Sequence, residues 1–191
     1  MLIYDTEILK CIPDKNKPQN PELEYCGGWN DFKGMGISCL AYQFDTKGVV
    51  FDWDDFDERN KFIALIKNQS KIIGFNSIQF DDQLLRANGI EIETTLDVLQ
   101  EIRFAAFGSH DWRDTPIGYT YSLDAIATAN CHKKTSTGAK APALWQQGQK
   151  KFVRDYCLND VILTSAILHL ALEGNLVDPN TGDFLKLYID I

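Results

Sequence analysis

Residues 153–172, VRDYCLNDVILTSAILHLAL, decide the fold, because they predict one long apolar helix with a carboxylate in its middle. We expect this helix over residues 148–173, with Gly174 directly after its end. A carboxylate buried in an apolar environment without a partner costs several kcal/mol, so the sequence raises the question of which group accompanies Asp160. No lysine or arginine lies within four residues of Asp160 on its own helix face. A metal ion is therefore the simplest partner, provided that other acidic side chains converge on the same point.

The first predicted strand, LIYDTEI, contains two more carboxylates. Side chains alternate across a strand, so Asp5 and Glu7 share one face while Thr6 points to the other. Two negative charges on one face repel each other unless a cation lies between them. Taken alone, the same pattern also describes a charged strand end that faces solvent.

A fourth carboxylate comes from GFNSIQFDDQLL, residues 74–85, where a buried strand is followed by a helix. Acids are favoured in the first turn of a helix, so the sequence leaves open whether Asp81 or Asp82 points inward. In the last helix, Tyr156 and Asp160 lie one turn apart on one face. Four acids on three elements can surround one point if two divalent cations, about 3.5–4 Å apart, neutralise them.

Three motifs in this order resemble those of a known superfamily. They are Asp5-x-Glu7, Asn76-x3-Phe80-Asp81 and Tyr156-x3-Asp160. Order and spacing resemble the exonuclease motifs of the DEDD (DnaQ-like) superfamily of 3′–5′ exonucleases, in its tyrosine subclass. The histidine subclass places a histidine five residues before its last aspartate, and that position here is Asp155. Residues 122–164 are further similar to polymerase-B-like exonuclease domains, which also carry an acid at the place of Asp97; we expect Asp97 to be structural.

The resemblance implies an α/β fold of the ribonuclease H-like type, with a mixed five-stranded sheet flanked by helices. It also implies that the first three strands are antiparallel. The residue pattern itself predicts strands over 1–6, 35–44, 49–53 and 71–76, and helices over 55–68, 79–88, 94–107 and 122–129. Residues 130–147 are expected to be mostly irregular. We expect one domain over 1–191, with a loop insertion at about 8–34 and a C-terminal hairpin at about 176–190.

The chemistry that the resemblance implies is hydrolysis of a terminal phosphodiester with two Mg²⁺ or Mn²⁺ ions, releasing 5′-mononucleotides. Asp5 would bridge both ions, and Glu7 and Asp160 would complete the site of one. Asp81 would act largely through water. Tyr156 would position the attacking water and help to deprotonate it, although an ordinary tyrosine, with a pKa near 10, is a poor base unaided.

The expected substrate is single-stranded nucleic acid, with DNA preferred. The net charge of −8 argues against a polyanionic partner, but residues 125–154 contain six basic side chains and no acidic one. A solvated loop and helix face would carry the same charges. The residues expected to contact nucleic acid are Thr6, Ile8, Asn76, Phe80, Lys133, Lys134 and Lys140.

Composition and context give the remaining expectations. The five scattered cysteines have no metal-site spacing, and the N-terminus lacks a signal-peptide pattern, so we expect a cytoplasmic protein without a membrane span. A polymerase, a helicase or another replication or repair protein is a possible partner. Three alternatives stay open: a catalytically silent member that binds nucleic acid or docks a partner, an RNA-trimming exoribonuclease, and an unrelated acidic enzyme.

Overall fold

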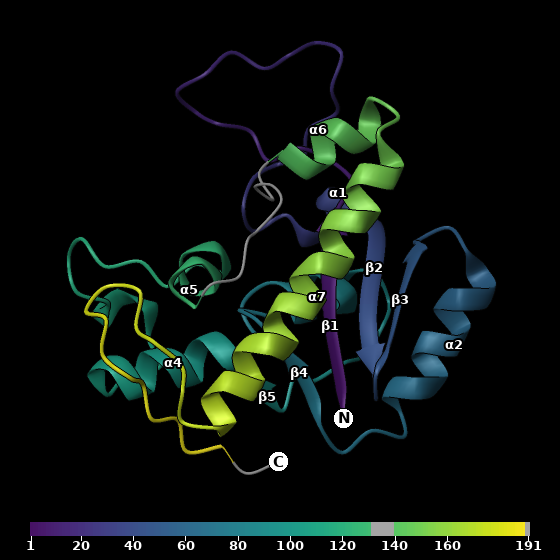
Figure 1. Ribbon diagram of the computed structural model, residues 1–191. Coiled ribbons are helices and arrows are strands. Elements are labelled where there is room, and N and C mark those ends of the chain that lie inside the picture. Colours follow the sequence, from purple (N-terminus) through teal and green to yellow (C-terminus); the bar gives the residue numbers. More distant parts are fainter. Residues whose placement is uncertain (131–139, 190–191) are drawn as a thin grey trace.

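The computed structural model describes residues 1–130 and 140–189, and it contains one mixed five-stranded sheet (Figure 1). The strands are β1 (Leu2–Ile8), β2 (Ile37–Phe44), β3 (Lys47–Asp52), β4 (Ile72–Gly74) and β5 (Leu96–Asp97). Their order across the sheet is β3-β2-β1-β4-β5. The predicted α/β fold with a mixed five-stranded sheet is confirmed, and its first three strands are antiparallel.

Strand β1 lies at the centre of the sheet, and its two edges are paired differently. One edge pairs with β2 in antiparallel fashion along the length of the strand. The other edge pairs with β4 in parallel, but only at Leu2 and Ile3. Beyond Ile3 the edge of β1 that faces β4 has no strand partner in the described sheet. Ligand sites form readily where the carboxyl ends of such parallel strands separate.

Seven α-helices and one short 3₁₀ helix (η1) surround the sheet in the described residues. They are α1 (Phe32–Met35), α2 (Phe56–Ile66), α3 (Asp81–Ala87), α4 (Val98–Phe107), η1 (Trp112–Asp114), α5 (Leu123–Ala129), α6 (Ala141–Gln146) and α7 (Lys150–Leu172). Helix α7 crosses one face of the sheet over β1 and β2, and α2 lies on the other side (Figure 1). Each face therefore has its own apolar core.

Helix α7 is long and apolar enough, by length and composition, to cross a membrane, with a mean hydropathy of 1.2 over its most apolar 18 residues. In this fold, 56% of that window is buried inside the protein. Its side chains Val153, Cys157 and Val161 pack with Ile3 and Cys39 of the sheet in one core. The helix is therefore a core helix, which is why its sequence is so apolar.

Three segments differ from the sequence-based expectation. Residues 141–146, expected to be irregular, form α6, because Pro142 suits the first turn of a helix and Trp145 is buried beneath it. The segment 94–107 begins with the short strand β5 before its helix starts. At the C-terminus the turn of the expected hairpin forms, but only one isolated bridge, between Val177 and Phe184, replaces the two strands.

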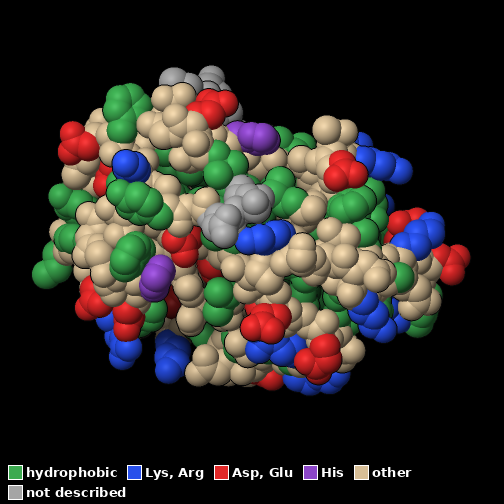
Figure 2. All heavy atoms as spheres, turned by 90° about the horizontal axis from the view of Figure 1, so that it is seen from below, with side chains coloured by type: hydrophobic (Ala, Val, Ile, Leu, Met, Phe, Trp, Pro, Cys, Tyr) green, Lys and Arg blue, Asp and Glu red, His purple; other side chains and the backbone are tan. Residues whose placement is uncertain are grey.

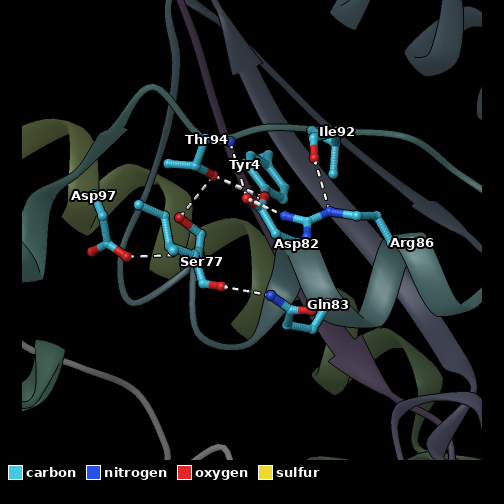
Figure 3. A network of polar contacts seen from close by, with 9 residues as sticks. Tyr4, Ser77, Asp82, Gln83, Arg86, Ile92, Thr94 and Asp97 are labelled. Carbon is cyan, nitrogen blue, oxygen red and sulfur yellow. Dashed lines mark hydrogen bonds and ion pairs between the residues drawn. The ribbon is translucent and has the colours of Figure 1, made fainter.

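A buried polar network centred on Asp82 joins β1, α3 and the segment before β5 (Figure 3). The Asp82 carboxylate accepts hydrogen bonds from the Tyr4 hydroxyl and from the backbone amide and hydroxyl of Thr94. It also pairs with Arg86, at 3.1 Å, while Asp82 itself is only 1% exposed. This acid therefore holds the first turn of α3 in place and has no capacity left for a ligand.

We predict that Asp82→Ala destabilises the protein by about 3–5 kcal/mol, because it leaves several buried donors without an acceptor. The free energy of unfolding in urea measures this effect. The matched control is Asp55→Ala, which removes the exposed N-cap of α2 and should cost about 1 kcal/mol. Equal losses for the two variants would show that the network does not stabilise the fold.

Candidate metal centre

Three carboxylates from opposite ends of the chain meet where α7 crosses β1. Asp5 and Glu7 lie on the face of β1 that α7 covers, and Asp160 lies in the middle of the helix. Oxygen atoms of the three side chains all lie within 4.8 Å of one another. Glu7 and Asp160 are buried, and Asp5 is half-buried. The structure thus brings together the first and last of the three sequence motifs.

The electrostatics of this acid cluster, defined as Asp5, Glu7 and Asp160, favour a cation. Burial raises the pKa of Glu7 well above its ordinary value, and the charges of Asp5 and Asp160 raise it further. A divalent ion would relieve both the repulsion and the cost of burying the charges. Because all the donors are carboxylate oxygens, the set suits hard ions such as Mg²⁺ or Mn²⁺.

Asp81, the fourth predicted acid, lies beside the acid cluster and accepts hydrogen bonds from Thr6. Its carboxylate accepts a hydrogen bond from the Thr6 backbone amide, at 3.1 Å, and another from the Thr6 hydroxyl. It therefore occupies the edge of β1 that β4 leaves unpaired. Burial raises the pKa of Asp81 to about 7, although the Thr6 hydrogen bonds oppose the rise. A role for Asp81 in metal binding stays a prediction.

Two side chains at the centre of α7 contact the acid cluster. The buried Tyr156 hydroxyl donates a hydrogen bond to Asp160, and burial together with the negative charges of Asp160 and Glu7 raises the tyrosine pKa far above its ordinary value. The neighbouring Cys157 thiol donates to the Asp5 carboxylate at 3.5 Å. Tyr156 is therefore a protonated hydrogen-bond donor at the cluster in the absence of metal.

Asn76 and Asp97 shape the loop between β4 and α3. Asn76 has a positive φ of 62°, and its backbone amide donates to the Asp97 carboxylate at 2.9 Å. The same carboxylate accepts from the amides of Ile78 and Leu99, so it ties the loop to the first turn of α4. In this position Asp97 is a structural residue, in keeping with its expected role.

Two cavities are each lined by residues of the acid cluster. The first has a volume of about 550 Å³ and is lined by Asp5, Asp160, Asn76 and residues between α4 and α5. The second, of about 850 Å³, is lined by Thr6, Glu7, Ile8, Phe80 and the insertion. Four of the predicted nucleic-acid contacts therefore line a cavity next to the acids: Thr6, Ile8, Asn76 and Phe80.

The predicted lysine contacts are placed differently. Lys140 directly precedes α6 and is exposed, and it lines neither cavity. Lys133 and Lys134 lie outside the described residues. On the face seen in Figure 2, the acidic and basic side chains of the described residues are interspersed rather than gathered by sign. The described residues of this face therefore form no broad basic surface for a polyanion.

Sequence reasoning missed Arg103, which lines the first cavity together with Asp5 and Asp160. Its side-chain Nε is buried and has no hydrogen-bond partner among the described residues. An arginine in the apolar helix VLQEIRFAAF was the available signal, of the same kind as the aspartate in α7. Gln146 was missed too: its side-chain amide bonds to the backbone of Leu9 and Glu24 and so fastens the insertion to α6.

Comparison with known proteins supports the fold. No protein-family model and no curated protein matches the sequence. Among solved structures, the chain is similar to the family B DNA polymerase from the hyperthermophilic archaeon Pyrobaculum calidifontis, with a TM-score of 0.58 and 19% sequence identity. The match covers 95% of this chain and 26% of the polymerase chain, so the chain spans about a quarter of that protein. At this identity the likeness shows the ribonuclease H-like fold alone.

We predict that saturating Mg²⁺ or Mn²⁺ stabilises the protein. Binding at about 100 times Kd contributes about 2.7 kcal/mol, which raises Tm by roughly 5–10 °C for a chain of this size. Asp160→Asn should raise Tm without metal, because repulsion falls, and should reduce the gain on adding metal. Glu91→Gln, at an exposed acid, is the control and should keep the full gain. An unchanged gain in Asp160→Asn would contradict the site.

Proposed function

We propose that this protein is a metal-dependent 3′–5′ exonuclease that releases 5′-mononucleotides from single-stranded DNA. The observation that carries the proposal is the meeting of Asp5, Glu7 and Asp160 within 4.8 Å at the crossing of β1 and α7. The resemblance of the three motifs to tyrosine-subclass exonucleases supports it. So does a fold shared with part of a family B DNA polymerase.

The acid cluster would hold two Mg²⁺ or Mn²⁺ ions, with Asp81 contributing through water. When bound, such ions polarise a phosphate and lower the pKa of a water molecule. The protein itself supplies three fixed carboxylates, two of them on a central strand and one on a core helix. Rigid placement of this kind lowers the entropic cost of aligning water and phosphate.

Tyr156 would act as a hydrogen-bond donor that orients the attacking water or a phosphate oxygen. In the metal-free protein its hydroxyl donates a hydrogen bond to Asp160, and burial together with the nearby carboxylates raises its pKa far above the ordinary value. Because a tyrosine is a poor base unaided, the metal ions would supply most of the activation of the water, and Tyr156 would position the water and help to deprotonate it.

The two cavities beside the acid cluster explain how a strand could reach it. A strand lying across the acids would extend into the space lined by Asn76 and into that lined by Ile8 and Phe80. The lysines at 133, 134 and 140 would add sequence-independent attraction for its phosphates. Ile8, which lines the second cavity, would press against the terminal base.

We predict that Asp5→Ala and Asp160→Asn abolish nucleotide release while the protein stays folded. The assay compares 3′-labelled and 5′-labelled single-stranded DNA in Mg²⁺ or Mn²⁺, and the 3′ label should appear first, as a mononucleotide. Asp55→Ala should be fully active. Near-normal turnover in either acid variant would remove the assignment of the site, and binding without release by the wild type would support a silent binding protein.

We predict that Tyr156→Phe lowers kcat about 10–100-fold and leaves metal affinity unchanged, because it removes only the hydroxyl. Turnover and metal titration on the same preparation measure the two quantities. The same assay with RNA of matched sequence tests the sugar preference, and faster release from RNA would overturn the choice of DNA. A wild-type rate in Tyr156→Phe would remove the role of the phenol.

A further inference from the structure

We propose that the cavity beside α4 is a binding site for a phosphodiester of single-stranded nucleic acid, in which Arg103 binds the phosphate and Trp112 and Tyr119 stack on a base. The inference deepens the proposed function, on which it rests, by naming the residues that would hold the strand next to the acid cluster. None of these residues belongs to the three exonuclease motifs.

Arg103 has hydrogen-bonding capacity that the described residues do not use. The Nε atom is buried and has no partner among the residues that the structure describes. Because the Nε atom is itself buried while the residue as a whole is half-buried and lines the cavity, a ligand there would be bound by the terminal nitrogen atoms of the guanidinium group. Arginine suits phosphate because its planar donors bind two oxygen atoms at once.

The acids nearest to Arg103 are engaged elsewhere. Asp97 and Asp111 are the two negative charges that favour the charged form of Arg103. The Asp97 carboxylate accepts hydrogen bonds from backbone amides of the loop before α3 and of the first turn of α4. The Asp111 carboxylate holds the side chain of Arg113, with both oxygen atoms near its Nε at 3.0 and 2.9 Å. Burial lowers the pKa of Arg103, and the charges of these two acids oppose that shift without a hydrogen bond to its Nε.

The cavity has the size and position of a subsite for one nucleotide. Its volume is about 550 Å³, within the range of small-molecule pockets. Its wall includes Asp5 and Asp160, so a ligand in it also reaches the acid cluster. A ligand in this cavity would place one anionic group at Arg103 and a second near Asp5 and Asp160, which would hold the metal ions of the proposed site. Successive phosphates of one strand are two such groups.

Aromatic rings line the same cavity and are held in place. Trp112 is 63% exposed and Tyr119 is 41% exposed, so both present ring surface to a ligand. Their loop is anchored where Thr120 and Asn180 exchange hydrogen bonds of 2.8 and 3.2 Å. The Tyr121 hydroxyl also donates to Asp178 at 3.0 Å. Aromatic rings on an anchored loop are a common platform for unpaired bases.

The second cavity is lined by no half-buried arginine or lysine among the described residues. Its basic side chains, Lys15 and Lys17, are exposed, and Lys17 pairs with Asp14 at 3.2 Å. Exposed pairs of this kind contribute little and are screened by salt. The charge distribution therefore places the phosphate contact at Arg103.

The test measures binding without turnover, by fluorescence anisotropy of a 5′-labelled single-stranded DNA in EDTA over a range of salt concentrations. Arg103→Gln should weaken binding about 10–100-fold and reduce the salt slope by about 0.7, the value for one phosphate on a single strand. Arg103→Lys should keep the slope. The matched control is Arg59→Gln, at a half-buried arginine on α2, which should leave both quantities unchanged.

The aromatic part is tested with Trp112→Ala, an exposed position at which folding is not at risk. Binding should weaken about 10-fold with an unchanged salt slope, whereas Tyr188→Ala, at another exposed ring, should have no effect. Wild-type affinity and slope in both Arg103→Gln and Trp112→Ala would overturn the inference. Binding that depends on Arg103 without nucleotide release in Mg²⁺ or Mn²⁺ would instead support this site and overturn only the proposed activity.

Discussion

Repulsion among carboxylates that the fold forces together is the constraint on which the rest of this structure depends. Asp5 and Glu7 cannot leave the acid cluster, because β1 is the central strand and pairs with β2 along its length. Asp160 cannot leave it either, because the apolar faces of α7 and the sheet form one core around it. The hydrophobic packing of α7 offsets the electrostatic cost, and a bound cation would remove it.

The adjacent acids Asp81 and Asp82, both in the first turn of α3, have different surroundings: Asp82 stabilises the fold, and Asp81 lies beside the acid cluster. Their side chains project about 100° apart around α3, so they reach different surroundings. Asp82 accepts hydrogen bonds from several buried donors and fixes the position of the helix. Asp81, held by this placement, reaches Thr6 at the unpaired edge of β1 beside the acid cluster. The functional geometry therefore depends on a residue that is not itself available to a ligand.

Periodicity predicted the long helix and four of the five strands, because these are local patterns. The mixed five-stranded sheet and the meeting of Asp5, Glu7 and Asp160, which lie far apart in the sequence, were expected from the resemblance of the three motifs in order. Periodicity and spacing could not choose between Asp81 and Asp82, because both fit the first turn of a helix and only the Tyr4 and Thr94 contacts decide. Helix α6 and strand β5 were missed because tertiary packing, not propensity, stabilises such short elements. The surroundings of Arg103 include Asp97 and Asp111. Sequence spacing alone does not predict that these acids lie near it.

The central claim is that the acid cluster is a divalent-metal site, and anomalous diffraction from crystals soaked in Mn²⁺ tests it most directly. The account predicts two Mn²⁺ peaks, both in contact with Asp5 and one of them also with Glu7 and Asp160. A soaked structure with no peak at these three carboxylates, in crystals that bind Mn²⁺ elsewhere, would contradict it.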